Sequence, residues 1–475
     1  MYDFLLKDVK KAHEYEELIK AFLRPDEFRL YSDDLDNVRI PEGDRPSEDG
    51  FDAVFPANED KNALKREIYR YLSRVTGKTL PWGIITGIRP VKLAGETVRA
   101  CGGDRGKAEK ILLDDYLVSE DRAEKALRIY EYQQRTAGKP AEGAAGIYIG
   151  IPFCPTRCLY CSFTSNQKDM SEIDRYLECL YKEIRWVSGR MAETGIWAES
   201  IYIGGGTPTT LDDQRLGKLL DLVNETLRCG ETREVTLEAG RADTITEEKL
   251  IIAKDADVDR ISVNPQTMKA STLELIGRET TVSQIKEAFD IASASGIATV
   301  NADLIAGLPG ESVDDFRETL DFITDCRPEN ITIHNLAIKR SSRLAGIDRD
   351  YHYKAADTVS EMLDHAEKRM KENGYEAYYL YRQKQMAGAG ENTGYCLPGH
   401  EGIYNIRIME EAQSIIALGA GGISKAYFPS ENRHERIANV SNYEVYIEKI
   451  DEMLRRKETG LFEPLKRYRE ENNAD

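Results

Sequence analysis

The spacing of apolar and polar positions changes along this chain, and the changes predict its folded elements. From residue 147 onward, short apolar and β-branched runs alternate with longer stretches whose apolar residues recur every three or four positions. The short runs predict strands, and the longer stretches predict amphipathic helices. The predicted strands are residues 147–151, 200–203, 234–238, 259–263, 299–305 and 330–335. The predicted helices are residues 170–189, 211–228, 246–255, 281–295, 312–325 and 355–373.

Strands and helices that alternate in this way form βαβ units, whose strands are parallel. Six units predict an α/β fold, a (β/α)6 partial TIM barrel, with its chemistry at the carboxyl ends of the strands. A Gly- and Pro-rich stretch at 137–146 indicates a domain boundary. We therefore predict an N-terminal α/β domain over 1–145, the barrel over 146–375, and a C-terminal α+β domain over 376–475.

The two flanking domains are predicted in less detail. In the N-terminal domain we expect helices at residues 61–76, 107–113 and 119–134, with a turn at 86–90. In the C-terminal domain we expect a closing helix at residues 443–459 and a polar, frayed tail after Arg467.

Charge and composition exclude several classes of function. The net charge of −18 argues against a general nucleic-acid binder. No apolar stretch approaches the roughly 18 residues of a membrane span, and the first residues lack the apolar core of a signal peptide. Eight cysteines in 475 residues are too few for a disulfide scaffold. We therefore expect a cytoplasmic protein that binds neither nucleic acid nor membrane.

Three of the cysteines form a compact motif directly after the first predicted barrel strand. Cys154, Cys158 and Cys161 have the spacing Cys-x3-Cys-x2-Cys, and the nearest histidines are the distant His13 and His334. Thiolates select iron–sulfur clusters, Zn²⁺ or Cu⁺, and a structural zinc site requires four ligands. A four-iron cluster on three thiolates leaves one iron open to another ligand. Three buried structural cysteines or an incomplete zinc site are the alternatives.

The motif with its neighbours resembles the radical S-adenosylmethionine (SAM) superfamily. Tyr148 and the run 151–154 precede it, Tyr160 lies within it and Phe163 follows it; together they resemble the branch of oxygen-independent coproporphyrinogen III oxidases (dehydrogenases) and haem chaperones. The resemblance implies a [4Fe–4S] cluster on the three cysteines and SAM on the open iron. It also implies that Tyr148 and Tyr160 contact the cofactor and that Tyr148 belongs to the catalytic set.

Further residues near the ends of successive strands resemble the SAM-binding positions of that superfamily. The glycine run 204–206 with Thr207 and Pro208 resembles the motif that contacts the SAM amino group, and glycines allow a close approach of backbone to ligand. Carboxylates accept hydrogen bonds from hydroxyls, and arginine pairs with carboxylates. The implied SAM-binding residues are Gly205, Gly206, Thr207, Glu238, Gln266, Arg278 and Asp303.

Segments 81–90, 334–340 and 378–388 extend the resemblance over nearly the whole chain, to the HemZ-like subfamily. The implied reaction is oxidative decarboxylation of two coproporphyrinogen III propionates to vinyls, giving protoporphyrinogen IX in anaerobic haem biosynthesis. A substrate with four carboxylates requires cations and an aromatic cavity. Arg382 is the predicted catalytic-site cation, and the other candidates are Lys339, Arg340, Arg343 and Lys384. The alternative is a solvated basic turn with the nearby tyrosines in a core.

Two positions depart from the best-understood oxidases of this branch. Gly150 stands where they carry a histidine, and Phe163 stands where they carry a fourth cysteine. Phe163 matches the haem chaperones, which lack that cysteine. Two other functions therefore stay open: a haem- or porphyrin-binding chaperone, and a radical SAM enzyme, such as a methyltransferase, that acts on another tetrapyrrole. The superfamily also implies a low-potential electron donor, a flavodoxin or a ferredoxin. We expect a monomer.

Overall fold

The computed structural model describes residues 1–32, 47, 50–163, 165–348, 350–384, 386 and 390–472. The chain forms two compact units, which are described separately. Unit 1 comprises Met1–Glu131 and Leu380–Glu391; unit 2 comprises Tyr132–Tyr379 and Asn392–Asp475. The segment 380–391, which we assigned to a C-terminal domain, therefore folds with the N-terminal residues, and the remaining C-terminal residues fold with the barrel.

Unit 1 contains a three-stranded parallel sheet, ordered β2-β1-β3. Its strands are β1 (Tyr2–Lys7), β2 (Phe28–Ser32) and β3 (Ala53–Pro56). Helices α1 (His13–Phe22) and α2 (Lys61–Thr76) contribute Leu18 and Ile68 to a core around Phe4. Three more helices follow: α3 (Pro90–Ala100), α4 (Arg105–Asp114) and α5 (Glu120–Thr136). The three predicted helices are confirmed, whereas β1–β3 and α3 were not predicted.

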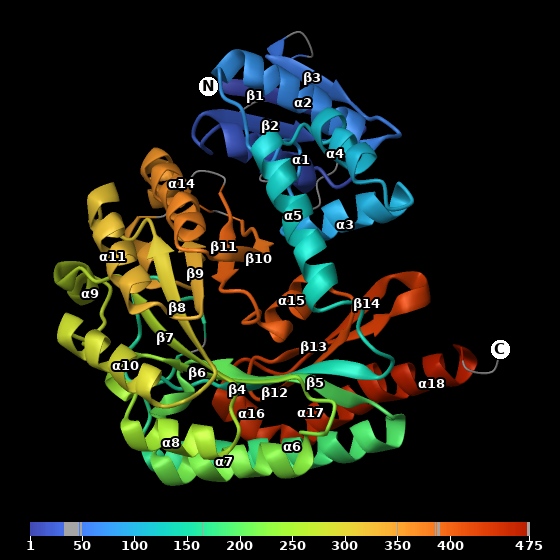
Figure 1. Ribbon diagram of the computed structural model, residues 1–475. Helices are drawn as coiled ribbons and strands as arrows, with labels where there is room; N and C mark the ends of the chain where they lie inside the picture. The colour runs from blue at the N-terminus through green and yellow to red at the C-terminus, as the bar shows by residue number, and fades with distance from the viewer. Residues whose placement is uncertain are drawn as a thin grey trace. The chain divides into compact units, whose positions relative to one another are not determined.

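Unit 2 is built on one sheet of eleven strands, ordered β10-β11-β9-β8-β7-β6-β5-β4-β12-β13-β14 (Figure 1). Strands β4 to β9 pair in parallel and in chain order, as expected of a (β/α)6 partial barrel. All six predicted strands are confirmed. Their bounds are β4 (Ala144–Ile151), β5 (Trp197–Gly205), β6 (Glu234–Gly240), β7 (Arg260–Gln266), β8 (Thr299–Ala306) and β9 (Asn330–Asn335).

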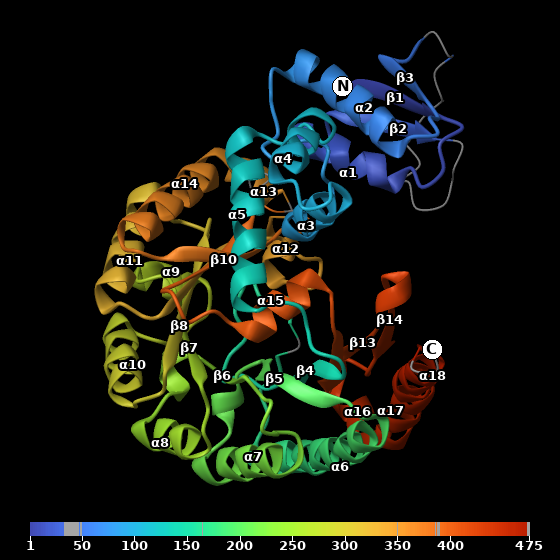
Figure 2. The ribbon, with the colours of Figure 1, turned by 45° about the vertical axis from the view of Figure 1, so that its right-hand side comes forward.

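Helices cover the outer face of these strands (Figure 2). The predicted ones are confirmed as α6 (Met170–Thr194), α7 (Asp213–Thr226), α8 (Glu247–Asp255), α10 (Val282–Ala294), α11 (Val313–Cys326) and α14 (Ala356–Glu372). The first five begin at a side-chain cap, which satisfies backbone N–H groups of the first turn: Asp169, Asp212, Thr246, Thr281 and Ser312. Short helices α9 (Ala270–Leu275), α12 (Arg343–Ile347) and α13 (Tyr351–Lys354) lie in the connections. No helix in the described ranges is both long and apolar enough to cross a membrane.

The C-terminal residues extend the barrel sheet at both of its edges. β10 (Glu376–Tyr381) and β11 (Asn392–Cys396) lie at one edge, where β11 pairs antiparallel with β9. β12 (Ser414–Leu418) pairs parallel with β4 at the other edge, followed by the antiparallel β13 (Ile423–Phe428) and β14 (Arg433–Ala438). The region after 392 therefore completes the sheet of unit 2.

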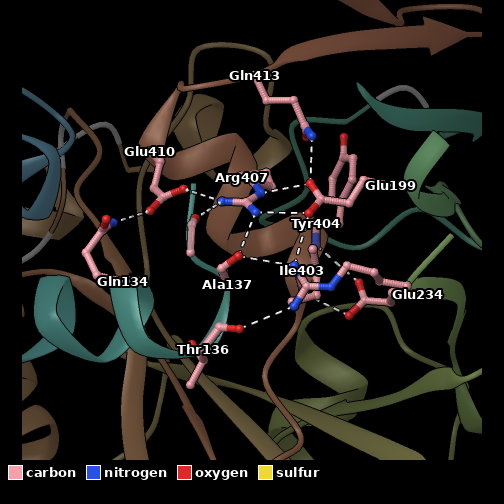
Figure 3. A network of polar contacts seen from close by, with 12 residues as sticks. Gln134, Thr136, Ala137, Glu199, Glu234, Ile403, Tyr404, Arg407, Glu410 and Gln413 are labelled. Carbon is pink, nitrogen blue, oxygen red and sulfur yellow. Dashed lines mark hydrogen bonds and ion pairs between the residues drawn. The ribbon is translucent and has the colours of Figure 1, made fainter. Parts of the chain in front are cut away.

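Buried ion pairs fix α15 (Ile403–Glu410) against this sheet (Figure 3). Glu199 accepts two hydrogen bonds of 2.9 Å from the fully buried Arg407. Glu234 accepts from the first backbone N–H groups of α15, at Ile403 and Tyr404, so it caps the helix. The position of α15 places Tyr404 against β5.

The predicted closing helix is divided into several pieces. α16 (Tyr443–Glu448) and α17 (Ile450–Lys457) are followed by a π-helical turn, Glu458–Phe462, and by α18 (Glu463–Asn472). The prediction of a frayed tail after Arg467 is wrong for the residues up to Asn472, because they continue helix α18. Arg469 donates to the carbonyls of Thr194 and Gly195, which anchors the last helix.

Candidate active site

The three cysteines lie in a loop that begins where β4 ends, and hydrogen bonds close this loop. Cys154 N donates to Asn166 O (3.1 Å), and Asn166 N donates to Pro152 O (3.0 Å). Phe153 is fully buried and packs edge-on against Tyr176 (5.3 Å between ring centroids). The cysteine loop, residues 152–163, is therefore anchored at the carboxyl end of the first barrel strand, where the chemistry of such barrels is built.

The thiols of the loop lie close enough to influence one another. Burial raises the pKa of Cys154 and of Cys161, and in both cases the neighbouring Cys158 adds to the rise. Thr207 Oγ1 donates to Cys154 Sγ (3.4 Å). In the described ranges no three His, Cys, Asp or Glu side chains gather around a single point as ligands of one ion. A four-iron cluster fits this set, because each thiolate binds a different iron.

The glycine run after β5 packs directly on the cysteine loop. A Cβ on Gly206 would lie 2.5 Å from Phe153 O and 2.9 Å from Cys154 Sγ, closer than real side chains approach. Gly205 has φ +116°, which side chains rarely adopt. Gly206 N donates to Ile151 O and Thr207 N to Phe153 O, both at 2.8 Å. A glycine at position 206 therefore allows the two segments to meet. The contact with SAM that the resemblance implies for this run stays a prediction.

Five strands each carry a polar or aromatic side chain near the carboxyl end that is partly exposed, whereas most of its strand neighbours are buried. We call these five residues the lumen row: Tyr148, Tyr202, Glu238, Asp303 and His334. Tyr148 and Tyr202 pair in register, and their rings stack at 6.2 Å. Tyr404 stacks on Tyr202 at 4.9 Å. Gly205 N donates to Glu238 Oε2 (3.0 Å), which links the row to the glycine run that packs on the cysteine loop. The sequence singled out Tyr148, Glu238 and Asp303 within it, but neither Tyr202 nor His334.

The two carboxylates of the row have different pKa values. Burial raises the pKa of Glu238 to about 7, and the charge of Asp303 adds to the rise, against hydrogen bonds from Gly205 N (3.0 Å) and the Tyr202 hydroxyl. Burial also acts on Asp303, but His334 and Asn301 hold its pKa below the ordinary value. Opposite shifts of this kind are common at functional sites. Both carboxylates can accept hydrogen bonds from ribose hydroxyls.

The end of β7 carries buried polar groups without protein partners. Gln266, with φ +68°, has an unpaired Oε1, and Asn264 has an unpaired Oδ1. Arg278 donates to Asn264 O and lies beside Cys158 and Tyr160, which hydrogen-bond to it. Unsatisfied buried polar atoms fit a site that takes a polar ligand. The structure thus brings Tyr160 and Arg278 together with Cys158, and Arg278 is bonded to the strand that ends at Gln266.

Two of the predicted substrate cations, Arg382 and Lys384, belong to unit 1, and Arg382 is bound within it. Its Nη1 donates to Ile85 O (2.6 Å), and its guanidinium lies 6.0 Å from the centre of the Trp82 ring. Burial lowers the pKa of Arg382 to about 10, and Glu391 partly opposes the shift. Within unit 1 this residue joins the predicted segments 81–90 and 378–388.

The two departures also have defined surroundings. A Cβ on Gly150 would meet the Tyr148 ring at 3.4 Å. The side chain of Phe163 is 71% exposed.

Comparisons with known proteins show the family to which this chain belongs. The Radical SAM superfamily model matches residues 148–323. The chain is 38% identical over 398 residues to the oxygen-independent coproporphyrinogen-III oxidase-like protein HemZ of Bacillus subtilis, covering 82% of this chain and 79% of that protein. It is 28% identical over 236 residues to the heme chaperone HemW of the same organism, covering 49% and 62%. The solved coproporphyrinogen III oxidase HemN of Escherichia coli shares the fold, with a TM-score of 0.53, 20% identity and coverage of 68% and 72%.

The barrel, the cysteine loop and these similarities define the class of protein. The chain belongs to the radical SAM superfamily and, within it, to the family of oxygen-independent coproporphyrinogen-III oxidase-like proteins that includes HemZ.

Proposed function

We propose that this protein decarboxylates two propionates of coproporphyrinogen III oxidatively and yields protoporphyrinogen IX in anaerobic haem biosynthesis. The observation that carries the radical chemistry is the contact of the cysteine loop with the glycine run, next to the lumen row. The substrate rests on the relationship to HemZ, whose name describes it as oxidase-like. All eight cysteines are free thiols, which supports a reducing compartment such as the cytoplasm.

The residues present fit the two cofactors that the superfamily implies. Cys154, Cys158 and Cys161 would hold a [4Fe–4S] cluster, and the backbone of 204–207 with Gln266 and Arg278 would hold the amino and carboxylate groups of SAM. Glu238 and Asp303 would accept hydrogen bonds from its ribose hydroxyls. When bound, the cluster and SAM supply a 5′-deoxyadenosyl radical that can abstract a hydrogen atom. The lumen row would orient SAM and screen the site from water.

The proposed reaction balances for each propionate. One hydrogen atom leaves the carbon next to the macrocycle, and the bond to the carboxylate carbon breaks with release of CO2. One further electron passes to an acceptor, and a C=C bond remains as the vinyl group. The chain must therefore bind a tetracarboxylate, for which the sequence predicted Arg382 as a cation. The hydrogen bond of its guanidinium to Ile85 O, within unit 1, favours a structural role for Arg382 instead.

A haem chaperone is the second candidate, favoured by Phe163. This exposed residue replaces the fourth cysteine of the oxidases, and chaperones named HemW match over about half of the chain. A chaperone would bind haem stoichiometrically without consuming porphyrinogen.

An anaerobic assay tests both candidates. The reconstituted protein would receive SAM, a low-potential reductant and coproporphyrinogen III, with products identified by mass spectrometry. Protoporphyrinogen together with 5′-deoxyadenosine is the expected result. If 5′-deoxyadenosine formed while the porphyrinogen stayed intact, coproporphyrinogen III would not be the substrate. S-adenosylhomocysteine among the products would indicate a methyltransferase. Tight haem binding without turnover would indicate a chaperone.

A further inference from the structure

The outer side of the cysteine loop is bordered by the segment that follows β9. Arg157 Nη2 donates to Ser341 O (2.9 Å), and Ser341 Oγ donates to Ser162 O (3.3 Å). Leu344 N, in α12, donates to Leu159 O (3.0 Å). The segment 339–347 and the cysteine loop thus form one continuous surface, which we call the loop surface. All of it belongs to unit 2.

Apolar side chains are unusually exposed on and beside the loop surface. Phe163 is 71% exposed, Ile347 at the end of α12 is 73% exposed, and Leu275 is 52% exposed. Leu275 adjoins Ile276, whose carbonyl accepts from Leu159 N (2.9 Å). Within the described residues, eight large hydrophobic side chains are exposed. Three of these eight lie on the cysteine loop or on segments that are hydrogen-bonded to it. Exposed apolar groups that cluster in this way mark interaction surfaces.

The loop surface is also positive in a strongly acidic protein. Residues 143–168 and 330–347 contain no Asp or Glu, although the chain carries a net charge of −18. Arg340 and Arg343 are exposed, and neither forms an ion pair within the part of the chain that the structure describes. Arg157 adds a third guanidinium beside Cys161. Two acidic residues border this surface, Glu274 next to Leu275 and Asp348 next to Ile347. Asp348 is paired with Lys354 (2.6 Å), so the positive surplus lies on the loop and α12.

We propose that the loop surface is the docking site for the protein's electron donor, a small acidic protein that carries a low-potential flavin or iron–sulfur centre. This inference rests on the proposed function only through the cluster at Cys154, Cys158 and Cys161. The transferred electron leaves the reduced donor, which is oxidised by one electron, and enters that cluster; no bond is made or broken. Interfaces of this kind combine an apolar centre with complementary charges that steer the encounter. The loop surface has both features next to the metal ligands.

Charge reversal tests the proposal. We expect R340E/R343E to weaken binding of oxidised flavodoxin by at least about tenfold in calorimetric titrations at low salt. The matched control is K466E/R467E, the same charge change at exposed residues of α18, and it should bind flavodoxin within about twofold of the wild type. Wild-type affinity should fall as salt is added. F163A should also weaken binding without changing its salt dependence.

Reductive SAM cleavage provides the second readout. With reduced flavodoxin, R340E/R343E should form 5′-deoxyadenosine at least about tenfold more slowly, whereas with dithionite its rate should match the wild type. Unchanged flavodoxin binding by R340E/R343E would overturn the proposal. An equal slowing of 5′-deoxyadenosine formation with dithionite would overturn it as well. Loss of porphyrinogen turnover with dithionite, at normal SAM cleavage, would assign the arginines to substrate carboxylates instead. If the wild-type protein cleaved SAM with either reductant but did not convert porphyrinogen, the proposed function would be refuted, and the flavodoxin-binding result would still decide the docking site.

Discussion

His334 Nε2 lies 3.6 Å from Asp303 Oδ2, and this pair joins two neighbouring strands inside the barrel. Asn301 Nδ2 donates to the other oxygen of the same carboxylate (2.7 Å). These contacts hold the pKa of Asp303 down although burial acts to raise it. Among the described residues no cation lowers the pKa of Glu238, which burial raises to about 7. The site therefore contains one carboxylate that stays ionised and one that titrates near neutrality.

The affinity for SAM should depend on pH through Glu238. Below about pH 7 its carboxyl group takes up a proton and can no longer accept from both ribose hydroxyls, so binding should weaken by up to about tenfold per pH unit. In Glu238→Gln the affinity should be lower and nearly independent of pH across this range. Calorimetric SAM titrations of the reconstituted wild type and of Glu238→Gln at several pH values measure the affinity and its dependence on pH. An unchanged pH slope in Glu238→Gln would assign the titration to another group.

His334→Gln should shift the acid limit of SAM binding. Without the imidazole, only the hydrogen bonds from Asn301 and Thr332 oppose the effect of burial on the pKa of Asp303, so this carboxylate should become protonated at a higher pH than in the wild type. The same titrations should show loss of affinity beginning at higher pH, while affinity at alkaline pH is retained. Equal loss at every pH would instead mean that His334 contacts SAM or substrate directly.

Gly206→Ala should prevent assembly of the cluster. The added methyl group would lie 2.5 Å from Phe153 O and 2.9 Å from Cys154 Sγ, so the cysteine loop must move. Iron and sulfide analysis after reconstitution should show a several-fold loss of bound iron. Gly217→Ala, in α7, is the control: its nearest neighbour lies 3.7 Å away, and alanine favours a helix. Normal iron content in Gly206→Ala would show that the loop tolerates the displacement.

The sequence predicts the barrel and most of its site because both follow from local order. Each strand is an apolar run, and Glu238, Gln266 and Asp303 stand near the ends of such runs, at places that resemble the SAM-binding positions of the superfamily. His334 also lies near a strand end, but the sequence supplied no partner for it. Its role depends on Asp303, a contact that only the pairing of β8 with β9 creates.

Long-range pairing and subtle helix signals were missed. β12 pairs with β4 although some 270 residues separate Ser414 from its partner Ala145, and no local pattern encodes that choice. α3 was overlooked because Pro90 was interpreted as the end of a turn, although proline is favoured at the first position of a helix. Tyr404 reaches the lumen row from α15, whose position depends on the buried Glu199–Arg407 pair.

Arg407→Lys should destabilise unit 2. Arg407 is fully buried, forms two bonds to Glu199 and also donates to the carbonyls of Ala137 (2.9 Å) and Gly138 (2.7 Å). A lysine cannot make this set of contacts, so the free energy of unfolding should fall by about 3 kcal/mol. Denaturant unfolding measures the change. Arg317→Lys, which alters an exposed ion pair with Glu361, should cost less than about 1 kcal/mol. Equal costs would show that the buried network contributes no more than a surface pair.

Arg382 has two candidate roles, to hold unit 1 together or to bind a substrate carboxylate, and Arg382→Lys separates them. Its guanidinium donates to Ile85 O and its backbone N–H to Ile88 O (2.8 Å), so it holds the segment 380–391 on the 81–90 turn of unit 1. We expect Arg382→Lys to speed amide hydrogen exchange in peptides covering residues 81–90, corresponding to about 1–3 kcal/mol of local stability.

With dithionite, Arg382→Lys should cleave SAM at the wild-type rate, and its KM for porphyrinogen should stay within about twofold of the wild-type value. Lys384→Ala is the control: it removes an exposed pair with Glu17 (3.5 Å) and should change hydrogen exchange by less than about 0.5 kcal/mol. The opposite result, a KM raised about tenfold with normal hydrogen exchange, would make Arg382 a ligand of the substrate carboxylate, as the sequence predicted. A change in both would mean that the 81–90 turn itself shapes the substrate site.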